Sequence, residues 1–206
     1  MTDLDKRLKQ LRSAEKKGDL DRLDRVRQKI IDEHGDAPEA VEARYKLGLA
    51  MLLRHGNLEQ AEPLFLEAAQ SSDPLYSPMA RTSYALLLHA RKRDQKALFE
   101  LRKIVSSRKP TPQSAVALAF IVQILQDTGA KPDDVERARQ QQIQQLQTLL
   151  EQTEVDATRA QLTLQLGLAQ VDHGDKAAAR ETLAEVLSLD ADDAAVATAK
   201  SALAAL

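Results

Sequence analysis

Four histidines are the residues of this chain that could most readily serve catalysis or metal binding. His34, His55 and His173 fall at expected helix ends or turns, where an imidazole can meet exposed carbonyl groups. His89 is expected in the middle of a helix, on its inner side, where it could serve recognition. None of the four has a second ligand at a metal-binding spacing such as H-E-x-x-H. The histidines therefore predict structural roles and no metal site.

Carboxylates occur in pairs at Asp133-Asp134 and Asp192-Asp193. Both pairs stand where a helix is expected to start, and acids there complement the helix dipole, so capping explains them better than acid–base catalysis. The sequence contains neither G-x-x-x-x-G-K-S/T nor G-x-G-x-x-G, the glycine-rich loops that bind phosphate groups. With no cysteine, thiolate chemistry is also excluded. We therefore predict that the protein is not an enzyme, with no catalytic residue and no cofactor.

The formal charge of −2 is unevenly distributed along the chain. Residues 77–110 hold nine Lys or Arg against two acids, a local +7, whereas residues 151–206 hold four against ten, a local −6. We favour a solvated helix surface as the role of the basic segment, with an acidic protein partner as the alternative. Nucleic acid fits less well, because only Tyr84 and Phe99 are interleaved with the charges and the pI is near 6.1. The predicted basic patch consists of Arg81, Arg91, Lys92, Arg93, Lys96, Arg102, Lys103, Arg108 and Lys109.

Small and large apolar residues recur over residues 41–70 at the spacing of two short packed helices. A first helix would carry Leu47-Gly48-Leu49-Ala50, and a second would carry Ala61 and Phe65, with the turn at His55-Gly56-Asn57. The small residues let the two backbones approach closely, and Phe65 can fill the space beside them. This stretch therefore predicts a helix hairpin.

The same spacing returns over residues 160–193. Leu166-Gly167-Leu168-Ala169 is followed by a turn at His173-Gly174-Asp175 and then by Ala179 and Leu183. This arrangement resembles the tetratricopeptide repeat, whose pattern places L-G and then A within a period of 34 residues. The resemblance implies helix hairpins stacked into a right-handed superhelix, with the first helix of each hairpin on the concave side.

Leucines alternate at Leu162, Leu164, Leu166 and Leu168, a pattern that normally indicates a half-buried strand. The flanking alanines and the absence of turn residues nearby favour a helix that is buried on two faces. A sheet through this segment would contradict the repeat interpretation.

The whole chain is expected to be all-α, a right-handed tetratricopeptide-like α-solenoid of about five helix-turn-helix repeats plus a C-terminal helix, in a single domain over residues 1–206. Clear repeats cover 41–73 and 160–193, degenerate repeats cover 3–36, 77–109 and 112–152, and a capping helix covers 193–206. The repeat at 77–109 lacks the turn glycine. The last helix has few polar residues, so it is either a poorly ordered tail or a surface packed against something else.

The register of the tetratricopeptide family, carried onto this chain, predicts the residues of a concave groove. The expected partner-binding residues are Tyr45, Lys46, Leu49, Leu53, Leu86, His89, Phe120, Gln123, Leu164, Gln165 and Leu168. This set is more apolar than charged, which suits a partner helix or an extended apolar segment. Several of its members could instead belong to the core between repeats. The clamp of Lys, Asn and Arg that some family members use for a peptide carboxylate is not supported, because the single asparagine, Asn57, lies in a turn.

The sequence thus predicts a protein–protein interaction adaptor or scaffold that binds a protein or peptide in this groove. The alternatives are a self-assembling scaffold, with a second copy of the chain as partner, and a chaperone for a secreted or membrane client. The stretch MTDLDKRLKQ lacks the apolar core of a secretion signal, and no apolar run approaches the length of a membrane span. A cytoplasmic location without membrane insertion is the expectation.

Overall fold

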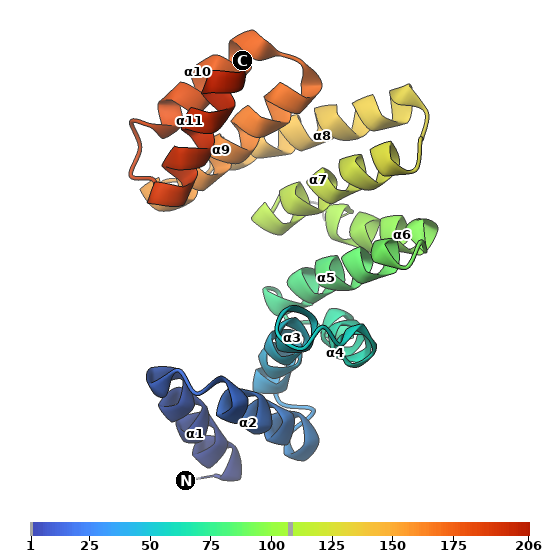
Figure 1. The fold of residues 1–206 in the computed structure, drawn as a ribbon, viewed down its shortest axis with the longest axis vertical. Coiled ribbons are helices and arrows are strands. Elements are labelled where there is room, and N and C mark those ends of the chain that lie inside the picture. Colours follow the sequence, from blue (N-terminus) through green and yellow to red (C-terminus); the bar gives the residue numbers. More distant parts are fainter. Residues whose placement is uncertain (1, 107–108) are drawn as a thin grey trace. The chain divides into compact units, whose positions relative to one another are not determined.

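The computed structural model describes residues 2–106 and 109–206, and every regular element in those ranges is an α-helix (Figure 1). Consecutive helices pack against each other from the first to the fifth and from the seventh to the eleventh, and the described residues contain the predicted five helix pairs followed by a C-terminal helix. The helices are α1 (Asp3–Lys17), α2 (Leu20–Glu33), α3 (Pro38–Leu53), α4 (Leu58–Gln70), α5 (Tyr76–Ala90), α6 (Asp94–Val105), α7 (Pro112–Asp127), α8 (Pro132–Glu151), α9 (Asp156–His173), α10 (Lys176–Val186) and α11 (Asp193–Ala205).

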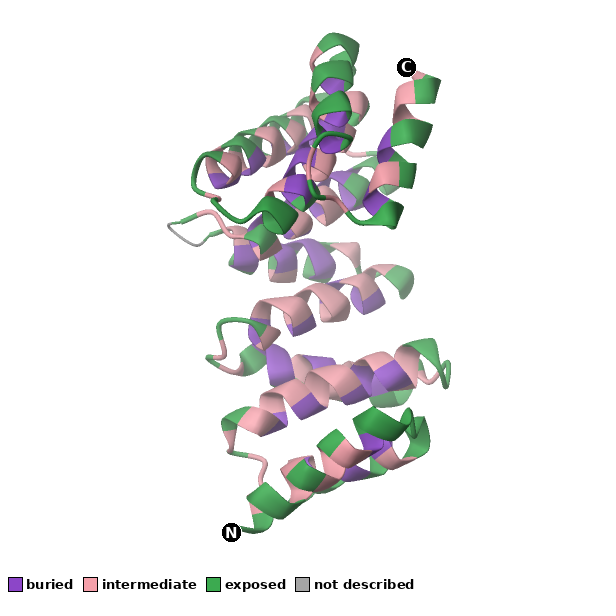
Figure 2. Cartoon of the chain, turned by 90° about the vertical axis from the view of Figure 1, so that its left-hand side faces the viewer, coloured by how far each residue is buried: buried purple, intermediate pink, exposed green. Residues whose placement is uncertain are grey.

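The chain divides into two compact units, Met1–Glu100 and Leu101–Leu206, with the boundary inside α6. We call them unit 1 and unit 2 and describe each by itself. Within each unit, buried residues lie along the helix sides that face neighbouring helices, and exposed residues gather at the turns (Figure 2). The single-domain organisation over residues 1–206 stays a prediction.

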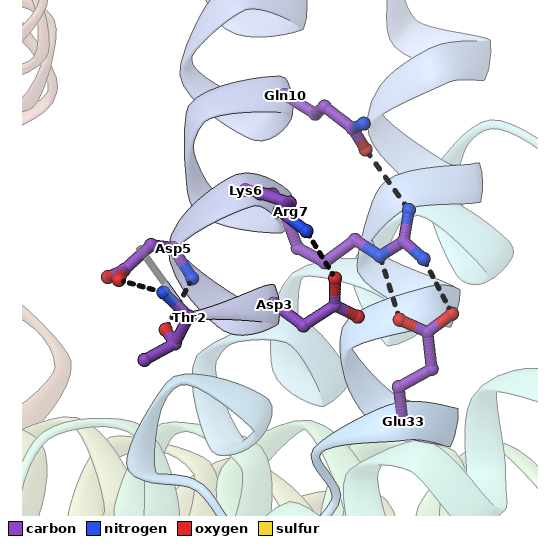
Figure 3. Close-up of polar contacts among 7 residues, drawn as sticks. All are labelled: Thr2, Asp3, Asp5, Lys6, Arg7, Gln10 and Glu33. Carbon is purple, nitrogen blue, oxygen red and sulfur yellow. Dashed lines mark hydrogen bonds and ion pairs between the residues drawn. The ribbon is translucent and has the colours of Figure 1, made fainter.

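Side-chain caps set the helix starts close to where the sequence predicts them. The Thr2 hydroxyl accepts a hydrogen bond from the Asp5 backbone N–H at 3.1 Å, and the Thr2 N–H donates to the Asp5 carboxylate at 2.8 Å (Figure 3). This reciprocal pair is a capping box. The third hairpin differs slightly, because its helix begins at Tyr76 instead of residue 77. Asp73 accepts hydrogen bonds from the backbone N–H groups of Leu75 and Tyr76 and so starts the helix one residue earlier.

Left-handed residues end the first helix of each hairpin. Lys92 has a φ of 59° and takes the place of the glycine missing from the third turn. A side chain disfavours this backbone region, whereas glycine adopts it freely. The other four positions are Gly18, Gly56, Gly129 and Gly174, with φ between 61° and 90°.

The two helices of the clear repeats pack most closely at a glycine. A Cβ atom added to Gly48 would lie 2.7 Å from the Phe65 ring, and Phe65 is fully buried. A Cβ atom added to Gly167 would likewise lie 2.7 Å from the Leu183 side chain. In both places a single added methyl group would overlap the partner helix. This agrees with the close approach of the two helices that the sequence predicts.

The alternating leucines lie in α9, which confirms a helix buried on two faces. Leu162 and Leu166 are buried in a cluster with Leu146 and Leu149 of α8. Leu164 and Leu168 pack instead against the cluster that contains Leu183 of α10. Each pair is four residues apart, so residues that alternate in sequence form two adjacent helical stripes.

The C-terminal helix α11 packs on its own chain. Ala199 is buried with Leu183 and Val186 of α10, and Leu203 and Leu206 pack against the same cluster. The interpretation of residues 193–206 as a poorly ordered tail is therefore wrong, and the apolar side of this helix covers α9 and α10.

An arginine of the first helix faces a glutamate of the second helix in four hairpins. The Arg7 guanidinium donates to both carboxylate oxygens of Glu33, at 2.7 and 2.8 Å (Figure 3). Arg44 also donates to the carbonyl oxygen of Gly35 at 2.9 Å, which ties its hairpin to the preceding loop. The other pairs are Arg44 with Glu67 at 2.8 Å, Arg81 with Glu100 at 2.5 Å, and Arg159 with Glu185 at 3.9 Å.

A carboxylate near the start of a second helix contacts the turn of the following hairpin. Asp24 of α2 accepts a hydrogen bond from Arg54 and lies 3.2 Å from Nε2 of His55. His55 and His173 thus lie beside carboxylates instead of the carbonyl groups expected from the sequence. The other contacts of this kind join Glu62 of α4 to Arg91 and Arg93, and Glu136 of α8 to His173.

Gly48→Ala is expected to lower the free energy of unfolding by about 1–3 kcal/mol, because the added methyl group overlaps a filled core. This loss exceeds the gain in helix propensity of about 1 kcal/mol. Urea unfolding followed by circular dichroism measures the difference. The cost should shrink in a Phe65→Leu background, since the smaller side chain leaves room. An equal cost in both backgrounds would show that Phe65 is not the obstacle.

Lys92→Gly is expected to raise the free energy of unfolding by about 1 kcal/mol, because glycine adopts a positive φ without a Cβ clash. Lys92→Ala removes the same charge but keeps the Cβ atom, so it serves as the matched control. Thermal unfolding of the two variants checks the prediction. Equal stabilisation by both would assign the effect to charge.

Candidate functional site

Six of the eleven predicted groove residues lie in unit 1, and α3 carries four of them. Tyr45 is half-buried, with its ring centroid 6.2 Å from that of Phe65 and 5.8 Å from that of Tyr76. Burial raises the pKa of Tyr45, and a hydrogen bond with Ser83 acts in the opposite direction. Tyr45 is therefore anchored between α4 and α5 and presents only part of its side chain.

A polar network borders this part of α3. The Lys46 ammonium lies 2.6 Å from the Glu42 carboxylate, and that hydrogen bond raises the pKa of Lys46. Burial, followed by the nearby charge of Glu42, raises the pKa of Tyr76. Neither Glu42 nor Tyr76 belongs to the predicted set, although the spacing of Glu42 and Lys46, four residues apart, is a recognisable helical ion pair. The predicted groove is consequently less apolar on this side than the sequence indicates.

A largely exposed leucine stands at the end of α3. The Leu53 side chain is 75% exposed, the largest value among the exposed large hydrophobic residues that the structure describes. Leu49 on the same helix and Leu86 on α5 are half-buried. Leu49 packs in part against the cluster around Phe65. These leucines combine core packing with accessible apolar area.

The expectation that His89 lies mid-helix is wrong. Helix α5 ends at Ala90, one residue later, and the His89 Nδ1 atom lies 2.5 Å from an Asp94 carboxylate oxygen. The left-handed Lys92 closes the turn immediately after it. His89 therefore joins the end of α5 to the start of α6.

The remaining five groove residues lie in unit 2, on α7 and α9. Gln123 is exposed and donates a hydrogen bond to Asp127 at 2.8 Å. Phe120 and Gln165 are half-buried. Leu164 and Leu168 are also half-buried, because they pack toward α10 and α11. The core therefore takes part of the side-chain surface that the family register assigns to a partner.

Several cations of the predicted basic patch are held by acids. Arg81 contacts Glu100 and the carbonyl oxygen of Ala69, and Glu62 binds both Arg91 and Arg93. This part of the patch therefore contributes to hairpin packing. Arg108 lies outside the described residues. Lys92, Lys96, Arg102, Lys103 and Lys109 are the exposed lysines and arginines that make up the rest of the patch in the described residues.

The described residues contain one group with metal-ligand geometry. Ligand atoms of Asp3, Glu33 and His34 lie within 4.8 Å of one another. The Arg7 fork already engages both oxygens of Glu33, and Lys6 lies 3.4 Å from Asp3 (Figure 3). Two cations therefore stand where a metal ion would have to bind, and the arrangement acts as an ion-pair network.

A cavity of about 630 Å³ opens in unit 1 between the loop after α2 and the loop after α4. Its walls include Asp36, Val41, Arg44, Glu67 and Asp73, and none of the predicted groove residues lines it.

No described helix combines the length and the apolar character that crossing a membrane would need.

No protein-family model and no curated protein sequence matches this chain. Solved structures do match. MamA is similar with a TM-score of 0.51 and 17% identity, over 85% of this chain and 91% of MamA. A protein of Podosopora anserina described as a kinesin light chain with nearly identical TPR-like repeats has a TM-score of 0.55 and 14% identity, over 90% of this chain and 93% of that one. BtubC from P. vanneervenii has a TM-score of 0.55 and 20% identity, over 91% of this chain and 74% of BtubC.

At these identities the similarity establishes the fold alone. It says nothing about which partners this chain binds. The order of the hairpins, the glycine contacts and the left-handed turns agree with that result. This chain has the all-α fold of tetratricopeptide-like repeat proteins.

Proposed function

We propose that this chain is a protein–protein interaction scaffold that holds a partner segment on the first-helix face of unit 1. The observation that carries the proposal is Leu53, a leucine three-quarters exposed at the end of α3. Leu49 and Leu86 are half-buried on the first helices α3 and α5. Apolar area of this kind is covered favourably when a partner binds, because burial removes it from water.

The border of this face determines which segment fits. Lys46 and Glu42 form an ion pair with Tyr76 beside it, so the border offers hydrogen bonds of both kinds. A partner segment with apolar residues on one side and polar residues along its edge complements such a surface. An amphipathic helix or an extended segment meets that requirement.

The groove residues of unit 2 extend the proposal. Phe120, Gln123, Leu164, Gln165 and Leu168 are proposed as further contacts, with the accessible parts of Phe120 and Gln165 as the main apolar and polar contributions. The tetratricopeptide-like fold supports a protein partner and a role without catalysis. The cytoplasm remains the proposed location.

Self-assembly is the second candidate. Residues 77–110 and residues 151–206 carry local charges of opposite sign, and exposed Lys92, Lys96 and Arg102 could face exposed Asp192 and Asp193 of another copy. A chaperone role uses the same leucine face for an apolar client, secreted or membrane-bound, in place of a stable partner.

Leu53→Asp is expected to reduce recovery of the partner at least about tenfold in affinity purification from the source organism, because it places a charge on the apolar face. Stability should stay within about 0.5 kcal/mol, since the side chain is exposed. Quantitative mass spectrometry measures recovery, and urea unfolding measures stability.

Leu75→Asp is the matched control for this experiment. Leu75 is also an exposed leucine of unit 1, but it lies in the loop before α5 and outside the predicted face. Equal loss of partner in both variants, or full recovery with Leu53→Asp, would refute the proposed face.

If the chain self-assembles through opposite charges, its mass by light scattering should rise with protein concentration at low salt and fall at high salt, because salt screens exposed charges. Lys92→Glu combined with Lys96→Glu should abolish the rise. A concentration-independent monomer at both salt levels would dismiss this candidate.

A further inference from the structure

The outer side of α6 exposes a phenylalanine. Phe99 is 60% exposed, whereas Phe65 is fully buried. The opposite side of the helix packs in the core through Ala97, Leu98 and Leu101, which are only 0–4% exposed. Large apolar residues that stay in contact with water often belong to surfaces that a partner covers. Phe99 is therefore a candidate anchor for a partner, and its neighbours decide which kind of partner fits.

Basic side chains surround this phenylalanine along the helix. Side chains three and four positions apart lie next to each other on the surface of an α-helix. Around Phe99 these positions hold Gln95, Lys96, Arg102 and Lys103, and all four are exposed. The five residues lie on one continuous helix, so their arrangement follows from that helix alone. We call them the α6 stripe.

The two acids of α6 both contact α5. An Asp94 carboxylate oxygen lies 2.5 Å from Nδ1 of His89, and Glu100 accepts a hydrogen bond from Arg81 at 2.5 Å. Among the residues of α6, all of which the structure describes, no exposed one is acidic. The α6 stripe therefore presents three cationic side chains and one apolar ring, without a carboxylate among them.

A surface of this composition suits an acidic partner that also carries an apolar residue. Carboxylates pair with lysine and arginine, and arginine can bind a carboxylate through two parallel hydrogen bonds. Aromatic residues and arginine are enriched at the centre of protein–protein interfaces, where a few such residues supply most of the binding energy. The Phe99 ring can thus anchor an apolar side chain while cations on either side hold carboxylates.

Two other classes of anionic partner fit the α6 stripe less well. Single-stranded nucleic acid stacks successive bases on several aromatic rings, whereas this stripe offers one. A membrane surface takes up the whole apolar side of an amphipathic helix, and that side of α6 already lies in the core. An acidic peptide segment needs only one apolar contact between its charges.

We propose that the α6 stripe binds an acidic segment of a partner protein. An apolar side chain of that segment packs against Phe99, and its carboxylates pair with Lys96 and Arg102. The surface differs from the leucine face of unit 1, because α6 is the second helix of its hairpin and those leucines lie on the first helices α3 and α5. The inference therefore does not rest on the function proposed for that face.

Fluorescence anisotropy with a labelled peptide, acetyl-Gly-Asp-Glu-Leu-Asp-Glu-Gly-amide, tests the proposal. One matched peptide replaces every acid with its amide, and another replaces leucine with serine. The acidic leucine peptide should bind at least about threefold more tightly than either, and its affinity should fall as salt is added, because salt screens exposed charges. Equal binding of this peptide and either matched peptide, or no saturable binding, would overturn the proposal.

Two variants locate the binding. Lys96→Gln combined with Arg102→Gln removes both charges from exposed positions, so it should weaken binding of the acidic leucine peptide at least about threefold. Phe99→Ser should weaken it similarly, because it removes the apolar contact. Circular dichroism verifies that each variant is folded. Unchanged affinity in both folded variants would refute the site.

Lys16→Gln combined with Lys29→Gln is the matched control, because it removes two exposed charges from α1 and α2, outside the α6 stripe. It should leave the affinity unchanged, as should Leu53→Asp on the leucine face. A loss equal to that of the Lys96 and Arg102 variant would show that the peptide senses general charge, and the site would be wrong.

The same variants test the other occupants. A labelled oligothymidine or phosphatidylserine vesicles that bind more tightly than the peptide, and lose that binding with Phe99→Ser, would reassign the α6 stripe to nucleic acid or to a membrane. A rise in peptide affinity when Asp192→Asn is combined with Asp193→Asn would reassign it to another copy of the chain. Each of these results would overturn the proposal.

Discussion

Close packing of two helices within a hairpin is the constraint on which this structure depends. Gly48 leaves the space that the Phe65 ring fills, and Gly167 leaves the space for Leu183. Because Phe65 is fully buried, its ring has no free volume into which it could move. The third hairpin has no glycine on its first helix, and its buried alanines, such as Ala85 and Ala97, provide the small residues there. Once the distance between the two helices of a hairpin is set, the side of the hairpin that faces away from their contact can pack against the next helix.

Charged side chains then connect the edges of the hairpins. Arg7, Arg44 and Arg81 each reach a glutamate of the partner helix. Arg44 also reaches the carbonyl oxygen of Gly35 in the preceding loop, and Arg81 reaches that of Ala69 in the last turn of α4. These pairs are partly buried, since the three arginine side chains are only 16–20% exposed. Their main consequence is functional, because cations held in this way are less available to an acidic partner. The face of unit 1 that we propose for recognition presents chiefly leucine, with a polar border.

The chemistry of the proposed face in unit 1 follows from the position of its residues in a hairpin. The face of unit 1 consists of first-helix residues, where side chains such as Leu53 project beyond the packed core. Exposed apolar area of this kind suits a partner segment that has one apolar side.

The sequence by itself determined the class of structure, most helix ends and the glycine contacts, because these depend on residues one to four positions apart or on the repeat period. Capping by Thr2, the turn at Gly174 and the two stripes of α9 all follow from such local patterns. The tertiary structure decided which arginine meets which glutamate and how deeply Tyr45 is anchored. It also placed His89 at a helix end, since Lys92 adopts a conformation that sequence patterns reserve for glycine. Successive side chains of an α-helix point in directions about 100° apart around the helix axis. Which side chains meet between two helices therefore depends on the rotation of each whole helix about its axis, and only contacts between helices fix that rotation.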